Sequence, residues 1–291
     1  MRILILSRNK ALYSTQSLIR ASEKRGHQVQ VYDHLMCNIV VECNRSKVMI
    51  GLDDLENYDA IIPRIGASAT QYGAAIVRQL ELTGSFVTVT AESLLKARDK
   101  LHCLQLLAAA GIDVPKTGIS AGDYCIPAVH DRISDNRSVI KLIASTQGLG
   151  VILSNSRNQG ISIVEGFHRV GQDVLIQEFI EDAGGADIRA FVVNGRVVAA
   201  MKRQAIPGEF RSNIHRGASA EPIRLSVTEE RIAVQSTTIL GLSIAGVDIL
   251  RSKRGPLVLE VNASPGLEGI EGSTGVDVAG HIIEFIENMT R

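Results

Sequence analysis

The stretch that most constrains this chain is residues 246–271, which read GVDILRSKRGPLVLEVNASPGLEGIE. Two short apolar runs, residues 247–250 and 257–261, flank a polar segment, residues 252–255, that ends in glycine. Apolar runs separated by such a segment are typical of a β-hairpin. The sequence therefore predicts two antiparallel strands near the end of the chain.

Three oxygen-bearing side chains interrupt this apolar pattern: Asp248, Glu260 and Asn262. Glu260 and Asn262 are two residues apart, so they share one face of a strand, and Asp248 can lie opposite them. Two carboxylates and an amide on one face would be costly against an apolar core, because buried charges need partners. Mg²⁺ or Mn²⁺ would supply that partner, since both favour oxygen ligands and bind together with nucleotide phosphates. Each side chain alone is more typical of a solvated strand position, but the three together predict a metal site.

Length and charge disfavour several classes of protein. The chain has 291 residues, 45% of them hydrophobic, which is typical of a globular protein of one to three domains. Lys plus Arg and Asp plus Glu both number 31, so the net charge of zero gives no general attraction to nucleic acid or to a membrane. The low aromatic content, 4%, also disfavours a nucleic-acid binder. No apolar run is long enough for a membrane span.

The four cysteines are Cys37, Cys43, Cys103 and Cys125, and none belongs to a CxxC pair. Neither a zinc site nor a redox motif is therefore indicated. They are typical of free thiols in a reducing compartment. The apolar run in residues 1–6 is too short for a signal peptide, so we expect a cytoplasmic protein.

The first third of the chain alternates strand and helix patterns. Apolar runs predict strands over residues 3–6, 29–32, 60–62 and 86–89, and amphipathic stretches predict helices over residues 12–24 and 71–82. This alternation indicates a parallel sheet covered by helices. The intervening residues 36–57 have weak periodicity, so we expect a loop or a small hairpin there.

Basic residues follow two of these strands. Arg8 and Arg64 come after the first and third strands, at the edge of a parallel sheet that usually holds ligands. They could bind an anionic substrate, or they could be ordinary surface arginines. No GxGxxG motif follows the first strand, which disfavours a dinucleotide site. A helical stretch is then predicted over residues 91–110, with Lys100 at a helix start, where phosphate binding is favourable.

The middle of the chain has features of a nucleotide site. Lys141 lies inside an apolar strand pattern, residues 139–142, and either extends its amine to solvent or meets an anion. A segment rich in hydroxyls and glycine follows, with Gly148 and Gly150, and it leads into a strand at residues 151–153. Such a segment offers backbone N–H groups to phosphate, although an ordinary turn explains it as well.

A second apolar strand, residues 174–180, is interrupted by Gln177 and Glu178. Backbone groups beside an adenine, and a carboxylate for the ribose hydroxyls, would explain this interruption. A kink in an edge strand would explain it equally well.

The last block begins at Asp187. Residues 188–193 and 196–200 predict a hairpin around Asn194 and Gly195, the strongest short hairpin signal in the chain. A charged, glycine-containing loop over residues 207–220 then carries Arg211, Ser212 and Asn213, which suggests a substrate-binding loop, although a solvated loop is the alternative. Two helices, residues 228–240 and 276–288, enclose the metal hairpin in sequence.

The order of these features resembles the ATP-grasp superfamily, and the segments resemble its RimK-like ligases along nearly the whole chain. The segments that carry the resemblance are SRNKALYS, IPRIG, KARDK, KLIASTQGLGV, QEFI, DIRAFVV, FRSNIHRG, AGVDIL and GPLVLEVNASPGLEGIE. The resemblance implies an α/β (α+β) ATP-grasp fold. It divides the chain into an N-terminal βαβ pre-ATP-grasp domain (residues 1–97), a central nucleotide-cradle subdomain (98–180) and a C-terminal antiparallel-sheet subdomain (181–291) that holds the metal.

The resemblance also implies roles for individual residues. Two Mg²⁺ or Mn²⁺ ions would be held by Asp248, Glu260 and Asn262, and the loop around Gly148 and Gly150 would close as a lid. The other residues that would bind ATP are Lys100, Lys141, Gln177, Glu178, Phe179, Ile180, Asp187, Arg211, Ser212 and Asn213. Those implied in catalysis are Arg203, Arg211 and Asn213, and those suited to acidic substrates are Arg8, Arg64, Arg203 and Arg216.

The activity implied is that of an ADP-forming glutamate ligase. ATP would phosphorylate a carboxylate, and the amine of L-glutamate would attack the acyl phosphate. The acceptor implied is the C-terminus of a small-subunit ribosomal protein, with poly-α-glutamate as a further product, and the assembly implied is a homo-oligomer, a tetramer. A ligase for a small molecule or a carrier protein is the alternative. A non-catalytic nucleotide-binding regulator ranks last, because it should have lost metal ligands.

Overall fold

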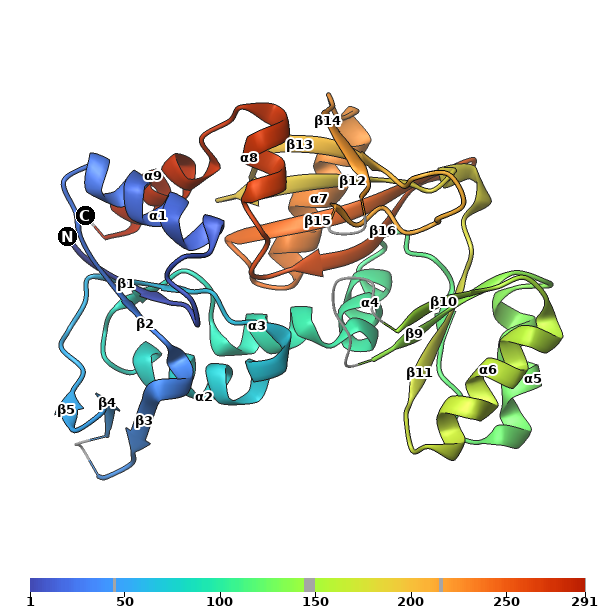
Figure 1. Ribbon diagram of the computed structural model, residues 1–291, viewed down its shortest axis with the longest axis horizontal. Coiled ribbons are helices and arrows are strands. Elements are labelled where there is room, and N and C mark those ends of the chain that lie inside the picture. The colour runs from blue at the N-terminus through green and yellow to red at the C-terminus, as the bar shows by residue number, and fades with distance from the viewer. Residues whose placement is uncertain (44–45, 144–149, 215–216, 291) are drawn as a thin grey trace.

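The computed structural model describes residues 1–43, 46–143, 150–214 and 217–290. Figure 1 shows the N-terminal sheet and its helices at one end, the sheet that contains β9 to β11 at the other, and the C-terminal sheet across the top between them. The arrangement confirms the expected mixed α/β fold.

The N-terminal sheet has the order β2-β1-β6-β7, and every neighbouring pair is parallel, as the alternating pattern predicted. In β1, four of the five residues are apolar and have no exposed surface, so this strand lies in the core. The strands are β1 (Arg2–Leu6), β2 (Gln28–Tyr32), β6 (Ala60–Pro63) and β7 (Phe86–Val87), and the helices packed on the sheet are α1 (Tyr13–Lys24) and α2 (Thr70–Glu81).

The segment expected to be a loop or a hairpin forms a small sheet of order β3-β4-β5. Its strands are β3 (Cys37–Val40), β4 (Lys47–Ile50) and β5 (Asp53–Asp54), and the 3₁₀ turn η1 (His34–Met36) leads into it. Cys37 and Val48 are buried and belong to the same apolar cluster as Ile76 and Leu80 of α2. Packing against α2 therefore stabilises this small sheet, which the weak local periodicity did not indicate.

The expectation of one helical stretch over residues 91–110 was wrong. The chain forms α3 (Ala91–Arg98) and α4 (Lys100–Ala109), separated at Asp99, whose φ of −79° and ψ of 105° are extended. The Asp99 carboxylate accepts a hydrogen bond of 3.0 Å from the backbone N–H of His102, so it caps α4. Lys100 is thus the first residue of a new helix, in agreement with its predicted place at a helix start.

The central sheet is antiparallel, with the order β10-β9-β11-β8. Two helices cover one face of it, and their residues Ile126 and Val164 pack with Ile140 and Ile176 of the sheet. The strand predicted over residues 174–180 ends at Glu178. The elements are β8 (Thr117–Gly118), α5 (Ile126–Ile133), β9 (Ser138–Leu142), β10 (Val151–Ser154), α6 (Arg157–Arg169) and β11 (Val174–Glu178).

The C-terminal sheet is also antiparallel, with the order β14-β13-β12-β15-β16. Both predicted hairpins are confirmed: Asn194 and Gly195 have positive φ values of 47° and 70°, and β15 pairs with β16. The strands are β12 (Ala186–Val193), β13 (Arg196–Gln204), β14 (Ser219–Pro222), β15 (Ile244–Ser252) and β16 (Gly255–Asn262), and the helices are α7 (Val227–Ile239), α8 (Glu268–Thr274) and α9 (Val278–Met289).

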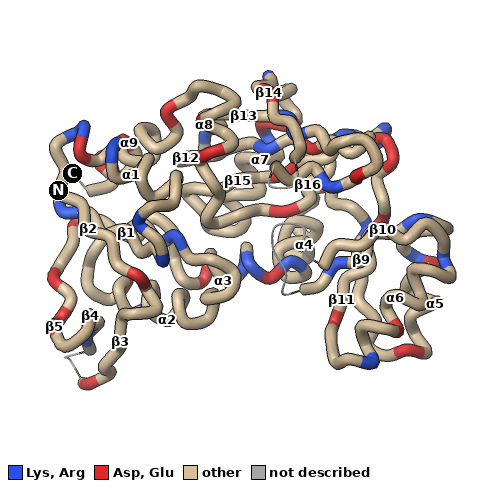
Figure 2. Tube along the Cα trace, in the orientation of Figure 1, with Lys and Arg blue, Asp and Glu red and all other residues tan. Residues whose placement is uncertain are grey.

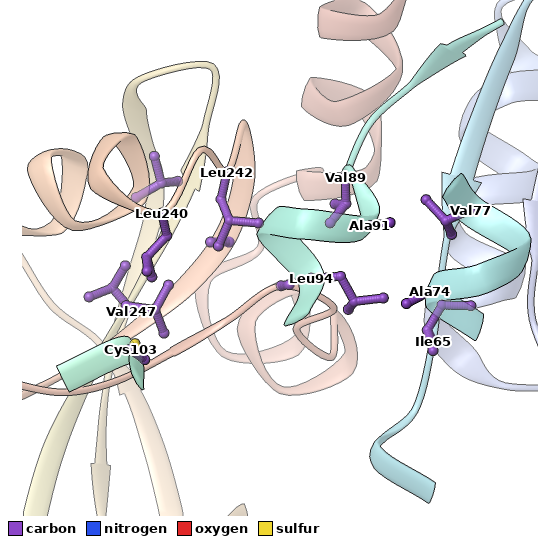
Figure 3. Close-up of a cluster of buried hydrophobic side chains, with 14 of the residues drawn as sticks. Ile65, Ala74, Val77, Val89, Ala91, Leu94, Cys103, Leu240, Leu242 and Val247 are labelled. Atoms are coloured by element: carbon purple, nitrogen blue, oxygen red, sulfur yellow. The ribbon is translucent and has the colours of Figure 1, made fainter. Parts of the chain in front are cut away.

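The N-terminal and C-terminal sheets share one apolar cluster. Figure 3 shows Ala91 and Leu94 of α3 between Val77 of α2 and Leu242, which precedes β15. Leu94 is fully buried in this cluster. The residues that follow α3 are therefore held in a fixed position between two sheets, and those residues include Lys100.

Candidate active site

One large cavity, of about 1140 Å³, is lined by residues from the central and C-terminal sheets and from the segments that follow strands of the N-terminal sheet. Every residue that the sequence predicts for catalysis or for ligand binding from Lys100 to Asn262 lines it, apart from Gly148, Gly150 and Arg216. Gly148 lies outside the described residues. Gly150 has a φ of +65°, and a Cβ atom there would lie 2.4 Å from Cδ1 of Leu142. Its carbonyl accepts a hydrogen bond of 2.9 Å from the N–H of Leu142, which continues the pairing of β9 with β10.

Two arginines bind two aspartates on the face of the C-terminal sheet that lines the cavity. Arg189 donates to both Asp248 oxygens, at 2.7 and 2.6 Å, and Arg203 donates to the same carboxylate at 2.9 Å. Arg203 also donates two bonds of 2.6 Å to Asp187. Strand register explains the cluster, because Asp187 lies opposite Arg203 and Arg189 lies opposite Asp248. Alternating charges across three strands therefore neutralise one another.

Burial is nearly complete in this cluster, since Asp187, Arg203 and Asp248 are 5%, 4% and 2% exposed. Burial alone would raise the pKa of Asp248, but Arg189 and Arg203 hold that pKa below its ordinary value. Ser212, one of the predicted nucleotide residues, donates to Asp187 at 2.6 Å. The cluster thus connects the loop after β13 to the predicted metal hairpin.

Arg189 was not among the predicted site residues. Its side chain packs beside Gly246, where a Cβ atom would lie 3.7 Å from its Cδ and 2.9 Å from Cβ of Pro265. Glycine at this position therefore leaves room for the guanidinium. The sequence signal was its position two residues after Asp187 on one strand, but its partner Asp248 is 59 residues away along the chain.

The three predicted metal ligands are brought together. Asp248 lies directly opposite Glu260, and Gly246 lies opposite Asn262, so all three side chains share one face. The Asn262 amide nitrogen donates to Glu260 at 3.0 Å, and the amide oxygen is the atom that would coordinate a cation. The set is two carboxylates and one amide, and no cluster of three His, Cys, Asp and Glu side chains that could hold a metal occurs among the described residues. Oxygen donors of this kind fit Mg²⁺.

Two lysines lie near the Glu260 carboxylate. The charges that act on Lys141 include Glu260, Lys100 and Asp248, so the amine of this residue on β9 lies among them. Burial lowers the pKa of Lys141 to about 8 and also lowers the pKa of Lys100. The Lys100 amine donates to the carbonyl of Ile143 at 2.9 Å, which ties α4 to the end of β9. The burial of two amines side by side favours an anionic ligand.

We expect ATP binding to weaken as the pH rises through about 8, because Lys141 loses its proton there and with it the charge that attracts phosphate. Lys141→Arg should remove this dependence between pH 7 and 9, since arginine keeps its proton up to a pH of about 12. Calorimetric titration with a non-hydrolysable ATP analogue measures both. An equal fall in affinity in the variant would contradict the assignment.

The segment predicted to line the adenine lies against the cavity, but its side chains have protein partners. Gln177 is 2% exposed and donates to the Thr117 hydroxyl at 2.7 Å. The Glu178 carboxylate accepts from the N–H of Lys116 at 2.7 Å and pairs with Arg254. Both carboxamide and carboxylate are thus held in place, and the backbone of residues 177–180 is what this segment presents to a base.

Two aromatic rings lie at the same end of the cavity. Phe179 packs edge-on against Phe210, with ring centroids 6.3 Å apart, and the Arg137 guanidinium lies 4.3 Å from the Phe179 centroid. Both phenylalanines line the cavity. They form an apolar surface of the kind that a nucleobase stacks on or packs against.

The loop after β13 reaches across to the central sheet. Arg211 donates to Glu209 at 2.9 and 2.6 Å and to the carbonyl of Val151 on β10 at 3.3 Å. Its guanidinium lowers the pKa of Glu209 to about 2. Arg211, Ser212 and Asn213 all line the cavity, as predicted, whereas Arg216 lies outside the described residues.

The N-terminal sheet contributes three more guanidinium groups to the cavity. Arg64 donates to the carbonyl of Pro265 at 2.6 Å, and burial lowers its pKa to about 10. Arg98 donates to the carbonyl of Ile65 at 2.8 Å, and Arg8 donates to the Ser68 hydroxyl at 3.2 Å. Arg98 was missed by sequence reasoning because it is the last residue of α3, and only the break at Asp99 turns the chain there. These arginines make the cavity cationic where the first sheet ends.

Comparison with protein families gives two matches that together span the chain. Residues 1–94 match the RimK PreATP-grasp domain, and residues 97–286 match the RimK-like ATP-grasp domain. The chain belongs to the RimK-like ATP-grasp family. Curated relatives of this RimK-like chain include proteins described as probable alpha-L-glutamate ligases. The one from Aliivibrio fischeri (strain MJ11) is 50% identical over 287 residues, covering 99% of this chain and 95% of the relative. The one from Vibrio vulnificus (strain YJ016) is 51% identical with the same coverage.

Solved structures confirm the ATP-grasp fold of this RimK-like chain. The ATP-grasp ligase PsnB, complexed with a phosphomimetic variant of a minimal precursor, Mg and ADP, has a TM-score of 0.75 at 19% identity and covers 100% of this chain and 98% of PsnB. A RimK domain ATP-grasp protein from Sphaerobacter thermophilus has a TM-score of 0.75 at 23% identity and covers 98% of this chain and 99% of that one.

The family and its curated relatives identify the chain as an ATP-dependent, ADP-forming ligase. ATP is its cofactor, and the cavity described above is its candidate active site. None of the helices in the described part of the chain is long and apolar enough to span a membrane.

Proposed function

We propose that this ligase joins L-glutamate to the C-terminal carboxylate of a polypeptide acceptor, a small-subunit ribosomal protein, and that it also makes free poly-α-glutamate. The observation that carries the proposal is the cavity itself, in which lysines and arginines surround a hairpin of two carboxylates and an amide. Some relatives are named probable alpha-L-glutamate ligases and are about 50% identical over nearly the whole chain. Their names support L-glutamate as the amino acid that is added.

The chemistry proposed has two steps. The acceptor carboxylate attacks the γ-phosphorus of ATP, which forms an acyl phosphate and releases ADP. The amine of glutamate then attacks the acyl carbon, the C–O bond to phosphate breaks, and inorganic phosphate leaves. Negative charge builds up on phosphate oxygens in both steps, so fixed cations in a cavity lower both barriers.

The residues are assigned as follows. Lys100 and Lys141 bind the phosphates of ATP, and Arg211 with Asn213 holds the γ-phosphate side. Arg203 fixes Asp187 and Asp248 beside them through hydrogen bonds of 2.6 to 2.9 Å. The remaining nucleotide contacts come from Gln177, Glu178, Phe179, Ile180, Asp187 and Ser212.

Metal ions are assigned to the hairpin. Two Mg²⁺ or Mn²⁺ ions would be held by Asp248, Glu260 and Asn262, and they would neutralise phosphate charge when bound. Asp248 already binds Arg189 and Arg203, so it would share its oxygens between these arginines and a cation. The loop that contains Gly148 and Gly150 is proposed to close over the nucleotide.

The arginines at the end of the N-terminal sheet are assigned to the acidic substrates. Arg64 and Arg98 use part of their donors on backbone carbonyls, at 2.6 and 2.8 Å, and both line the cavity. A guanidinium presents five N–H donors, so several remain for a carboxylate. Arg8 adds a third guanidinium near the surface, and Arg203 and Arg216 complete the set proposed for acidic groups.

The test is ADP release from ATP and Mg²⁺ with L-glutamate, with and without the ribosomal protein, together with mass spectra of the acceptor. A ladder of glutamyl additions on the protein would support the proposal. Turnover with glutamate alone would restrict the function to polyglutamate synthesis. No turnover with either, despite ATP binding, would favour the alternative, a ligase for a small molecule or a carrier protein.

We also propose that the ligase is a cytoplasmic homo-oligomer, a tetramer. Its cysteines Cys37, Cys43, Cys103 and Cys125 are free thiols, which is consistent with a reducing compartment. Exposed apolar side chains gather around the small sheet: Leu35, Met36, Val40, Val41, Leu52 and Tyr72. Contiguous apolar patches of this kind commonly mark protein interfaces.

Light scattering should therefore give a mass about four times that of the 31.4 kDa chain. Replacing Val40 and Val41 by lysine should lower that mass, because charges on an interface oppose association. Replacing Val170, an exposed valine of the central subdomain, by lysine is the matched control. A monomeric wild-type protein would contradict the proposal.

A further inference from the structure

An ordered loop presents two apolar side chains at the edge of the cavity. Leu12 and Tyr13 are 53% and 38% exposed, and they are the large exposed apolar residues of the described chain that line this cavity. The other exposed apolar side chains lie elsewhere on the surface. Isolated exposed apolar residues are ordinary, but an adjacent pair beside a charged cavity needs a partner that is partly apolar. We call residues 8–13, which follow β1 and end at the first residue of α1, the rim loop.

Polar groups around the rim loop hold its backbone in place. Asn9 accepts a hydrogen bond from the N–H of Ala11 at 2.8 Å, and the Gln16 amide donates to the carbonyl of Lys10 at 2.8 Å. Ser14, which follows the loop, accepts from the N–H of Leu267 at 2.9 Å and so fixes the loop to the turn before α8. These bonds hold the backbone and the small polar side chains of the rim loop, while Arg8, Lys10 and Leu12 are exposed to solvent.

The charge of the rim loop is positive. Arg8 and Lys10 are exposed, and residues 7–14, SRNKALYS, contain no acidic residue. The Arg20 guanidinium lies 5.9 Å from the centroid of the Tyr13 ring, which adds a third cation behind the loop. Acids are present nearby, because Asp33 and Glu268 line the same cavity. The rim loop itself nevertheless combines cations with apolar surface, and this combination is complementary to a peptide that is acidic and partly apolar.

A polypeptide that reacts at its C-terminus must cross an edge of the cavity, and the rim loop with its exposed Leu12 and Tyr13 lies at one such edge. An extended chain advances at most about 3.3 to 3.6 Å per residue, so only the last few residues fit inside the cavity. The residues before them lie at the opening. A free amino acid or a dipeptide has no such residues and gains nothing from an apolar edge.

We propose that the rim loop is the docking surface for the acceptor polypeptide. Leu12 and Tyr13 bind an apolar side chain that precedes the reacting terminus, and Arg8 and Lys10 bind acidic side chains beside it. The inference rests on the proposed function, because it assumes a polypeptide acceptor, and it goes further by giving the acceptor a recognition site outside the reaction centre.

The test compares two ligands with the full chain in the presence of Mg²⁺ and a non-hydrolysable ATP analogue. The long ligand is a fluorescein-labelled decapeptide with an apolar residue before an acidic C-terminal segment, and the short ligand is the dipeptide Glu-Glu. Changing both Leu12 and Tyr13 to alanine should raise the Kd of the decapeptide about tenfold, because two partly buried side chains are truncated. The Kd of the ATP analogue is the check that the site remains folded.

Two further variants sharpen the result. Leu82→Ala removes a side chain that is 76% exposed and does not line the cavity, so the decapeptide should bind as it does to wild type. Lys10→Glu reverses one charge of the rim loop, and it should weaken decapeptide binding and reduce the dependence of that binding on salt. Neither effect is expected for Glu-Glu.

The outcomes separate this inference from the proposed function. If wild type binds the decapeptide no more tightly than Glu-Glu, or if the double variant binds it as tightly as wild type does, the docking surface is wrong. Those results would leave ADP release with glutamate, and hence the ligase proposal, intact. Absence of any glutamate-dependent ADP release would instead contradict the proposed function, whatever the rim loop binds.

Discussion

Arg203→Met should lower the free energy of unfolding by about 3 to 5 kcal/mol, because it leaves Asp187 without its arginine in a buried site. Asp187 is 5% exposed and keeps only the Ser212 hydroxyl, while Asp248 keeps Arg189. Methionine replaces most of the volume of arginine, so lost packing contributes little. Urea unfolding followed by circular dichroism measures the change.

The neighbouring residue Lys202 provides the matched control. It lies on the same strand and pairs with Glu221 at 3.4 Å, but both side chains are well exposed, at 36% and 66%. Lys202→Met should cost less than about 1 kcal/mol, because water screens an exposed ion pair. Equal losses in the two variants would mean that the buried pairs give no particular stability to the sheet.

Glu260→Gln should reduce ADP release by roughly a thousandfold, the effect of removing a key charge-stabilising group. Glutamine keeps the shape of the side chain and its oxygen can still accept the bond from Asn262, so the hairpin should fold. What is lost is the negative charge opposite Asp248 that would attract the metal. The coupled assay for ADP, run across a series of Mg²⁺ concentrations, measures the loss.

An exposed glutamate elsewhere serves as the reference. Glu230 lies in the first turn of α7, outside the cavity, and Glu230→Gln should leave ADP release unchanged. A Glu260→Gln enzyme that keeps wild-type turnover would show that the metal assignment is wrong. Partial activity restored by high Mg²⁺ would agree with it.

The elements that sequence reasoning found are those with strong local patterns. The N-terminal alternation and the hairpin around Asn194 needed no knowledge of distant contacts. Helices α5, α6 and α8 and strands β8 and β14 were missed. In α6, Gly160 weakens the helical pattern, yet a Cβ atom there would lie 2.7 Å from Nε2 of His130 on α5. The two helices approach so closely here that a side chain larger than glycine would not fit. No local sequence pattern indicates this contact between helices.

In the candidate site, too, the parts that come from one short segment were predicted and the parts that depend on distant contacts were not. The metal hairpin was predicted because Asp248, Glu260 and Asn262 come from one short segment. Arg203 was among the predicted site residues and Arg189 was not. The pairing of both arginines with buried aspartates could not be predicted, because it depends on the register among three strands. The division into domains at residues 97 and 180 stays a prediction, since the first and last sheets share one apolar cluster.

The termini of the chain lie beside each other, with α9 packed on α1 (Figure 1). Glu287 of α9 binds Arg25 at 2.5 Å and His27 at 2.8 Å, just after α1. Figure 2 shows that charged residues of both signs occur on these two helices. During translation, the part of the apolar face of α1 that packs on α9 therefore stays uncovered until the last helix has been synthesised. Contacts this distant in sequence form slowly, so the nascent N-terminal region should depend on chaperones until the ribosome releases the whole chain.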